Sequence, residues 1–562
     1  MKDPNGMCFL IAPEEKVMTK ELGYFLKRKG FILPLILALV LCFGYSATHI
    51  AQGVDDLCRT AHTAGGSFIG TGRIFGWTTM MLLGHDGQET ILQVLVGTAL
   101  LGLGAALFCV LFRRASGDRI PLGAYVVFAC LLVSFPMNAE AYIYADTGFM
   151  NKLSYALVPL AMLLADDWVT KGGWLRLLGA VFCIAYGVGM FESAAVVFVC
   201  SAGADLTLRQ LLGPISGNGI EPKERWKDFF KRGFMLVGIL VAAILFSKML
   251  SKAAMALFSI PEWIQPSQSV YWFSEEMSVG ERLGYLIRKI IIKYWISGLF
   301  NLSLLMICLG WCISLILAVI TLIRRRYLAV FSLFVTALSP ILLTLIAGQF
   351  APFRTMLGAA PFVGFAVLLG LSLLWKDGKG DKRIYHFGIS IMLIIALFQC
   401  YDMNNLFKAD YENYQQELAM LENIHGRLTA EHAIDEKPLI FWSVGWYGDY
   451  SEQTLRYRQV DTSNRFYKAL YNRIRFLPDC IDIHVLPNAN LYWAIAGGDF
   501  FAEHTPQQEI QRYLHLLGYT DLIMPDRDTM ALFKAAGLPE SSPYPAKDCI
   551  VDCGEYIFIN LG

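Results

Sequence analysis

The stretch ETILQVLVGTALLGLGAALFCVLFRR, residues 89–114, decides the fold class of this chain. Its apolar run is long enough to cross a bilayer as a helix, which takes roughly 17–25 mostly apolar residues, and it ends on two arginines. Similar runs recur along the 562 residues, which are 55% hydrophobic and 17% charged, with a mean hydropathy of +0.47. Ordinary soluble domains are about 25% charged. The composition therefore predicts an integral membrane protein.

About eleven helical spans are expected from the apolar runs. Residues 13–30 are polar, and the run from 31 lacks a cleavage site and is followed by many more runs, so we expect a cytoplasmic N-terminal segment at 1–30 rather than a cleaved signal peptide. The expected spans lie near 31–48, 89–112, 120–136, 149–165, 174–189, 191–208, 233–257, 300–323, 328–349, 356–375 and 384–400. The pair around residue 190 can also be read as one long kinked segment.

Basic residues in the short loops set the expected orientation, because cytoplasmic loops carry an excess of Lys and Arg. With eleven spans, every basic cluster falls on one side, which we take as the cytoplasmic side of a bacterial inner membrane. The N-terminus is then inside and residues 401–562 are outside. The clusters are Lys27 to Lys29, Arg113, Arg114 and Arg119, Lys171, Lys223 to Arg232, Arg324 to Arg326, and Lys376 to Arg383.

This map divides the chain into a transmembrane domain at 31–400 and an extracytoplasmic domain at 401–562. Four outer loops can build a common site, at 49–88, 137–148, 258–299 and 350–355. The tail opens with a helical pattern and continues with strand-like runs (PLIFWSV, IDIHVL, LIMP, CGEYIFINL) and a helical stretch, QQEIQRYLHLLGY. Strands that alternate with helices predict a small α/β domain. A disulfide among Cys480, Cys549 and Cys553 is left open.

The first outer loop contains the strongest candidate residues, in GVDDLCRTAHTAGGSFIGTGRIFGW at 53–77. Asp55 and Asp56 can act as a general base on an acceptor hydroxyl, or hold a divalent metal on a phosphate leaving group. Arg59 and Arg73 can neutralise that phosphate, because a guanidinium pairs with two phosphate oxygens at once. The alternative is a solvated loop in which an aspartate caps a helix.

Further candidates lie at the other expected outer boundaries. Glu140 and Asp146 occupy the second outer loop, where simple surface exposure is the alternative. Glu192 stands between two apolar runs, at a depth where an ionisable group suggests a functional site. Arg354 precedes the tenth span at the outer face, where it can bind phosphate or extend to the lipid headgroups.

The stretch ERLGYLIRKIIIKYWISG, residues 281–298, predicts an amphipathic helix on the outer membrane surface. Arg282, Lys289 and Lys293 are spaced seven and four residues apart and share one face. They can bind a lipid phosphate, or the helix can be a plain interfacial one. In the tail, aromatic residues can stack on sugar faces or form domain core: Trp442, Trp446, Tyr447, Tyr492 and Trp493.

Several classes of protein are disfavoured by the sequence. Lys plus Arg and Asp plus Glu balance at 47 each, which gives no sign of a nucleic-acid partner. No dinucleotide fingerprint, Walker lysine motif or HExxH zinc motif occurs. These absences argue against a nucleotide-driven pump and a zinc protease.

Four pieces of the chain resemble one family. They are GVDDLCRT followed by GRIFGW, the hairpin YGVGMFESA, APFRTMLGAAPF before a late span, and DYENYQQELAMLENIHGRL at the start of the tail. In order and in expected placement they resemble the Gtr-type polytopic bacterial glucosyltransferases, whose phage-encoded members modify O-antigen. This family is part of the GT-C class of lipid-linked-sugar transferases.

The resemblance implies a mechanism and partners. A polyprenyl-phosphate hexose, glucose in this family, is moved to the outer leaflet and donates its sugar to a glycan such as a surface polysaccharide or a teichoic-acid-like wall polymer. A donor synthase and a small flippase would supply it. The base maps onto Asp55 or Asp56, and Arg73, Glu192 and Arg354 line the donor site. Phe191-Glu192 departs from the more usual aromatic-Gln pair, which leaves a different role open for Glu192.

Two other functions compete with a membrane glycosyltransferase. The first is a transporter or flippase of lipid-linked glycans, for which inverted repeats and ionisable groups near the midplane are typical. We find no repeat, and the ionisable groups gather at the outer boundary. The second is a non-catalytic membrane scaffold whose tail binds glycan, in which the acidic pair would be dispensable.

Overall fold

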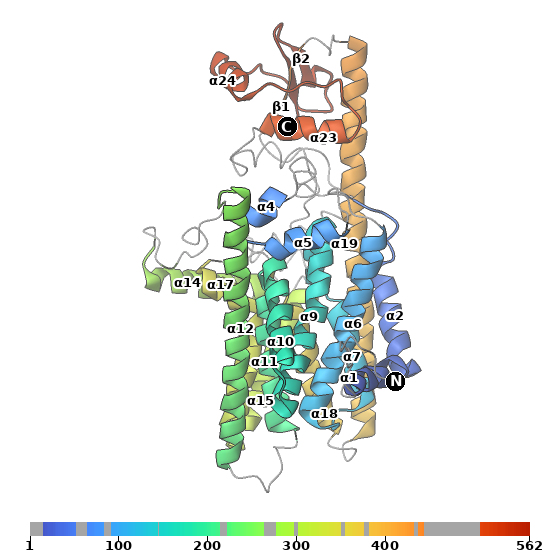
Figure 1. Cartoon of the computed structure of the whole chain (residues 1–562). Helices are drawn as coiled ribbons and strands as arrows, with labels where there is room; N and C mark the ends of the chain where they lie inside the picture. Colours follow the sequence, from blue (N-terminus) through green and yellow to red (C-terminus); the bar gives the residue numbers. More distant parts are fainter. Residues whose placement is uncertain are drawn as a thin grey trace, which may run out of the picture.

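The chain folds into a bundle of long helices that carries a small α/β unit at one end (Figure 1). This is a computed structural model. It describes residues 15–51, 65–83, 91–143, 145–213, 222–262, 272, 277–296, 302–349, 355–375, 381–431, 437–442 and 506–561.

Long apolar helices build the bundle. They are α2 (Lys29–Phe43), α6 (Ile91–Ser116), α7 (Leu122–Val133), α9 (Ala145–Lys171), α10 (Trp174–Met190), α11 (Ser193–Leu211), α12 (Pro222–Phe258), α15 (Leu302–Ile323), α16 (Tyr327–Leu338), α17 (Leu342–Ala347), α18 (Ala359–Trp375) and α19 (Lys382–Glu431). Shorter pieces flank them: α1 (Glu15–Leu26), α4 (Gly65–Gly70), α5 (Ile74–Leu83), the turn η1 (Pro136–Asn138), α8 (Ala139–Tyr142), α14 (Val279–Ile290), the π-helical η3 (Ile291–Ile296) and the turn η5 (Ser339–Ile341).

A helix occupies each of the eleven apolar segments expected from the sequence. Among the described residues, seven helices are long and apolar enough to cross a membrane, and four shorter apolar helices accompany them. The protein is therefore a multi-pass membrane protein, while the count of eleven and the orientation stay predictions. The segment around residue 190 is two helices rather than one, because Phe191 is extended and ends α10 before α11 begins.

Close helix packing in the bundle depends on small residues. A Cβ on Gly104 of α6 would lie 2.4 Å from the backbone oxygen of Tyr155 on α9, so these two backbones touch where only glycine fits. Polar groups in this core are bonded across helices. Asn138 donates to the Tyr155 hydroxyl at 2.9 Å, and that hydroxyl donates to the backbone oxygen of Leu357 at 2.7 Å. These contacts join α9 to α6, to η1 and to the segment before α18.

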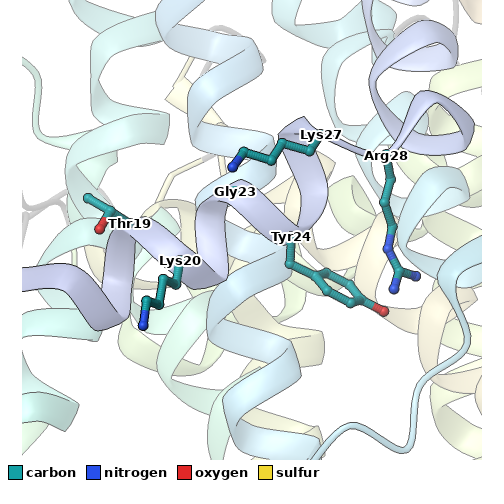
Figure 2. A pocket seen from close by; sticks show the side chains of 6 residues that line it. All are labelled: Thr19, Lys20, Gly23, Tyr24, Lys27 and Arg28. Carbon is teal, nitrogen blue, oxygen red and sulfur yellow. The ribbon is translucent and has the colours of Figure 1, made fainter.

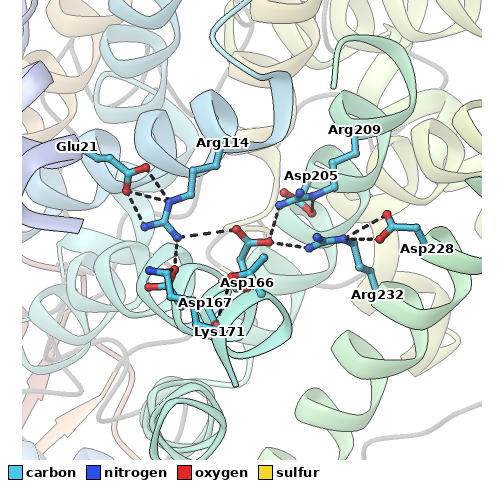
Figure 3. A network of polar contacts seen from close by, with 10 residues as sticks. Glu21, Arg114, Asp166, Asp167, Lys171, Asp205, Arg209, Asp228 and Arg232 are labelled. Atoms are coloured by element: carbon cyan, nitrogen blue, oxygen red, sulfur yellow. Dashed lines mark hydrogen bonds and ion pairs between the residues drawn. The ribbon is translucent and has the colours of Figure 1, made fainter. Parts of the chain in front are cut away.

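A network of buried ion pairs ties helices together at the end of the bundle where α1 lies (Figure 3). Asp166 of α9 accepts from Arg232 at 2.6 Å and from Arg209 at 2.9 Å. Arg114 of α6 donates to Glu21 of α1 at 2.6 Å. The remaining members are Asp167, Lys171, Asp205 and Asp228. Breaking such a pair costs several kcal/mol because it leaves an uncompensated buried charge, so the network holds α1, α6, α9, α11 and α12 in register.

The C-terminal unit contains a three-stranded sheet in the order β1–β3–β2. The strands are β1 (Leu439–Trp442), β2 (Ile550–Asp552) and β3 (Ile557–Asn560), with α23 (Pro506–Leu516), α24 (Arg527–Ala536) and the turn η10 (Lys547–Cys549) around them. β1 pairs with β3 in parallel, with Leu439 opposite Ile557, and β2 pairs with β3 antiparallel.

The sequence expectations for this unit are partly confirmed. Strands form within PLIFWSV and CGEYIFINL and a helix within QQEIQRYLHLLGY, whereas β2 was not expected. LIMP is not a strand, although the backbone oxygen of Ile523 accepts from the Leu439 amide at 2.8 Å. IDIHVL and Cys480 lie outside the described residues. Cys549 and Cys553 are free thiols and are not bonded to each other.

The last span and the start of the tail form one continuous helix, α19, so the expected domain boundary at 400/401 lies inside it. At 1.5 Å per residue its 50 residues extend about 75 Å. The upper end belongs to the core of the C-terminal unit, where Leu421 and Leu428 pack with Phe441 and Ile557. The sheet therefore lies at the far end of α19, beyond the bundle, as Figure 1 shows.

Candidate functional site

The structure describes part of the expected site. Asp55, Asp56, Arg59 and Arg354 lie outside the described residues. Glu140, Asp146 and Lys293 belong to described helices (α8, α9 and η3), but their side chains are outside the description. The side chains of Arg73, Glu192 and Lys289 are described.

Arg73 and Glu192, 119 positions apart in sequence, form an ion pair. α4, which ends three residues before Arg73, lies at the end of the bundle nearest the C-terminal unit (Figure 1). Arg73 follows α4, and Glu192 stands in the break between α10 and α11. Arg73 donates from Nη2 to Oε2 of Glu192 at 3.0 Å and from Nε to the same oxygen at 3.2 Å. The guanidinium carbon lies 5.0 Å from the centre of the Phe191 ring. The first outer loop and the YGVGMFESA hairpin are thus joined by a charge-assisted pair.

The turn before Arg73 places this pair beside α12. Gly72 has a φ of +78°, in the left-handed region that glycine adopts without strain. Its backbone oxygen accepts from the Ser251 hydroxyl at 2.9 Å. A Cβ at Gly72 would lie 3.0 Å from the ammonium nitrogen of Lys248, so the lysine reaches over the bare glycine. Lys248 is therefore the second cation of the site.

The electrostatics of Glu192 follow from these neighbours. Burial by itself would raise the pKa of this carboxyl, but the charge of Arg73, the hydrogen bonds that the carboxylate accepts and, last, the charge of Lys248 together outweigh that effect. The pKa of Glu192 lies below its usual value. The carboxylate is charged at neutral pH, and the three side chains together carry one net positive charge.

A second polar cluster joins the start of the first outer loop to α8, α9 and α19. Lys152 of α9 is 2% exposed, and its ammonium lies 4.7 Å from the centre of the Phe43 ring and 5.3 Å from that of Tyr142. It lines a small cavity together with Ser46, His49, Ala51, Tyr142, Ile143, Phe407 and Asp410. His49 stacks on Tyr45 at 4.0 Å between ring centres. Residues 49–51, at the start of the expected first outer loop, therefore lie beside a buried lysine and a buried aspartate.

The amphipathic helix forms as α14, with Ser278 and Glu281 making a capping box at its start. Two of the three expected basic residues have described side chains, and these two meet different surroundings. Arg282 is buried and donates to the backbone oxygen of Gly348 at 3.3 Å, whereas Lys289 is half-buried, 5.4 Å from the centre of the Tyr285 ring. Arg282 turns inward because it bonds a carbonyl. The exposed stripe is apolar: Val279, Leu283, Ile287, Ile291 and Trp295. This supports the plain interfacial helix.

Two residues of these clusters escaped the sequence reasoning. Lys248 stands in the second half of the apolar run at 233–257, and Lys152 near the start of the run at 149–165. An ionisable group in a membrane segment is a functional-site hypothesis by default, so both carried a usable signal. The cavity itself depends on how α8, α9 and α19 come together around it, which the sequence did not signal.

The chemistry available here is the binding of an anion. Nη1 of Arg73 and the ammonium of Lys248 have no hydrogen bond recorded within the described residues, so both can donate to phosphate oxygens. In the part of the chain that the structure describes, no group of three or more His, Cys, Asp and Glu side chains has the arrangement of a metal site.

Comparison with known proteins identifies the family. The family described as glucosyl transferase GtrII matches residues 44–371, more than half of the chain. A dolichyl-phosphate-mannose–protein mannosyltransferase 1 of Candida albicans is 28% identical over 153 residues, which is 26% of this chain and 16% of that protein. No solved structure matches. The match at 44–371 includes Arg73, Glu192, Lys152 and Lys248, and on this evidence the chain belongs to the GtrII glucosyl transferase family.

Proposed function

We propose that this protein transfers a hexose, glucose by its family, from a polyprenyl phosphate to a hydroxyl of a cell-surface glycan, on the side of the membrane where the C-terminal unit lies. The observation that carries the proposal is the Arg73–Glu192 pair with Lys248 beside it. This places surplus positive charge at one end of a helical bundle. The related Candida protein is named for dolichyl-phosphate mannose, a sugar on a polyprenyl phosphate, which supports a donor of that class.

Lys248 is proposed as the main partner of the leaving phosphate. Glu192 already occupies two of the nitrogens of Arg73, so that guanidinium has only part of its donors to offer. An ammonium is a compact point charge suited to phosphate oxygens. Glu192 then holds Arg73 in place and keeps its charge from repelling Lys248.

Asp55 and Asp56 remain the proposed base candidates. The acceptor oxygen attacks C1 of the sugar, the bond from C1 to the phosphate oxygen breaks, the hydroxyl proton passes to the carboxylate, and the electron pair leaves on the polyprenyl phosphate. Asp55 follows Ala51, which lines the Lys152 cavity, by four residues.

Purified protein in liposomes tests the enzyme against its competitors. A polyprenyl-phosphate glucose and an oligosaccharide acceptor on the same side of the bilayer should yield glycosylated acceptor with no second protein. Movement of donor between leaflets without product would favour the flippase, and neither activity the scaffold.

Asp55→Asn and Asp56→Asn test the base. Removing a general base typically costs 10²- to 10⁴-fold in rate, so one of the two variants should lose transfer by about that factor. Glu262→Gln is the matched control, because Glu262 is an exposed carboxylate just beyond the end of α12. Full transfer by both aspartate variants would remove the acidic pair from the mechanism.

A further inference from the structure

A basic pocket lies on α1, at the end of the bundle away from the candidate site (Figure 2). Thr19, Lys20, Gly23, Tyr24, Lys27 and Arg28 line it. Lys20, Gly23 and Lys27 are spaced three and four residues apart, so they follow one helical face. Gly23 leaves the surface between the two lysines open, since the nearest atom to a Cβ there would be Cε of Lys27 at 3.8 Å. The pocket therefore has two ammonium groups around a bare patch of helix.

The pocket keeps its positive charge because the neighbouring acid is engaged elsewhere. Glu21 turns into the ion network and binds Arg114 at 2.6 Å. Within the described residues, the salt bridges recorded do not include Lys20, Lys27 or Arg28. Arg28 lies over the Tyr24 ring at 3.7 Å, and Arg113 lies over the same ring at 3.7 Å. Tyr24 thus holds a guanidinium at the pocket rim.

An exposed apolar stripe begins directly after the pocket along the chain. α2 starts at Lys29, immediately after Arg28, and exposes a row of side chains on one face. The row consists of Leu33, Ile36, Leu37, Val40 and Leu41. From Leu33 to Leu41 it extends about 12 Å along the helix, against about 15 Å for half the hydrocarbon core of a bilayer.

We propose that α1 and α2 together bind one anionic phospholipid of the leaflet at this end of the bundle, with its phosphodiester in the basic pocket and an acyl chain along the α2 stripe. The charge selects an anion, and the adjoining stripe selects an anion attached to a hydrocarbon chain. This site is separate from the proposed donor site, because α1 and the Arg73–Glu192 pair lie at opposite ends of the bundle.

Lipid titration of the full chain tests the site. Protein purified in a neutral detergent is titrated with phosphatidylglycerol or phosphatidylcholine, and bound lipid is counted by native mass spectrometry. Lys20→Gln/Lys27→Gln should weaken phosphatidylglycerol binding roughly 25-fold, at about fivefold for each basic residue lost from an anionic surface. Phosphatidylcholine binding should not change.

Two further variants separate a built site from general attraction. Lys227→Gln/Lys231→Gln removes two exposed lysines of α12, and it should change binding less than twofold. Gly23→Leu keeps every charge but fills the patch between the lysines, and it should weaken binding at least fivefold. The proposal would be overturned by an equal loss of lipid binding in the α12 control or by full binding in Gly23→Leu. Displacement of the lipid by millimolar glycerol 3-phosphate would overturn it as well.

Discussion

Replacing Glu192 by glutamine tests whether the Arg73 pair organises the candidate site. The variant keeps the size of the side chain and one acceptor oxygen but removes the charge. The side chains of Arg73 and Glu192 are 22% and 40% exposed, between a surface pair and a buried one. Exposed pairs contribute about 0–1 kcal/mol, and breaking a buried pair costs about 3–5 kcal/mol. We therefore expect a loss of about 1–2 kcal/mol in the free energy of unfolding.

The effect also has a defined pH dependence. The folded-state pKa of Glu192 is lowered, so the contribution of the pair is present above the usual glutamate range and is lost as the pH falls through the lower folded value. The difference between wild type and Glu192→Gln should stay constant from pH 7 to about pH 5 and shrink below about pH 4.

Thermal unfolding of the detergent-solubilised protein measures this difference. A thiol-reactive dye can report it, because Cys109, Cys200 and Cys308 are buried free thiols that react once the bundle opens. Identical midpoints for wild type and Glu192→Gln at pH 7 would falsify the pairing. A difference that grows on acidification would show that the folded-state pKa of Glu192 is raised rather than lowered.

Three further predictions concern other parts of the bundle. Lys248→Gln should lower sugar transfer about 10²-fold if its ammonium meets the leaving phosphate, since lost transition-state contacts of this kind cost 10²- to 10³-fold. The control Lys252→Gln, one turn further along α12, should keep transfer within twofold of wild type. Equal losses of transfer in the two variants would point to a general surface effect. Asp166→Asn should destabilise the protein by about 3 kcal/mol, because Arg209 and Arg232 lose a shared acceptor. Sugar transfer per folded molecule should not change. An unfolding midpoint equal to that of wild type would contradict the predicted loss of stability. A cysteine at Glu540, in a Cys553→Ser background, should react with a membrane-impermeant thiol reagent on intact cells, and labelling only after lysis would reverse the predicted orientation.

The membrane fold was accessible from sequence because span-length apolar runs leave few alternatives. Every expected run contains a helix, and the break at Phe191 separates two of them as one of the two interpretations had it. The continuity of α19 was harder to see. Hydropathy changes near Cys400 and suggests a boundary, but CYDMNN contains neither proline nor glycine, and nothing local stops the helix there.

The candidate site was only partly accessible for a different reason. The order of the family-like motifs in the sequence pointed to Arg73 and Glu192 as site residues. Their contact could not be predicted, because the two residues are 119 positions apart and their meeting depends on how α5 packs against α10, which the periodicity of the sequence does not encode. Arg282 shows the same limit. Its spacing placed it on a basic face with Lys289, yet the carbonyl of Gly348 draws it inward. Spacing gives the face of an isolated helix, and tertiary partners decide what that face meets.

The two ends of the bundle also use their basic residues differently. The positive-inside rule counts every Lys and Arg alike, but Arg114 and Arg232 are each bound by carboxylates on neighbouring helices and so hold the bundle together. Lys20, Lys27 and Arg28 keep their charge at the surface of the same end. At the other end, one acid, Glu192, faces both Arg73 and Lys248. A basic residue can therefore bind an incoming anion only where the fold has not already matched it with an acid, and that condition is met at the α1 pocket and beside Gly72.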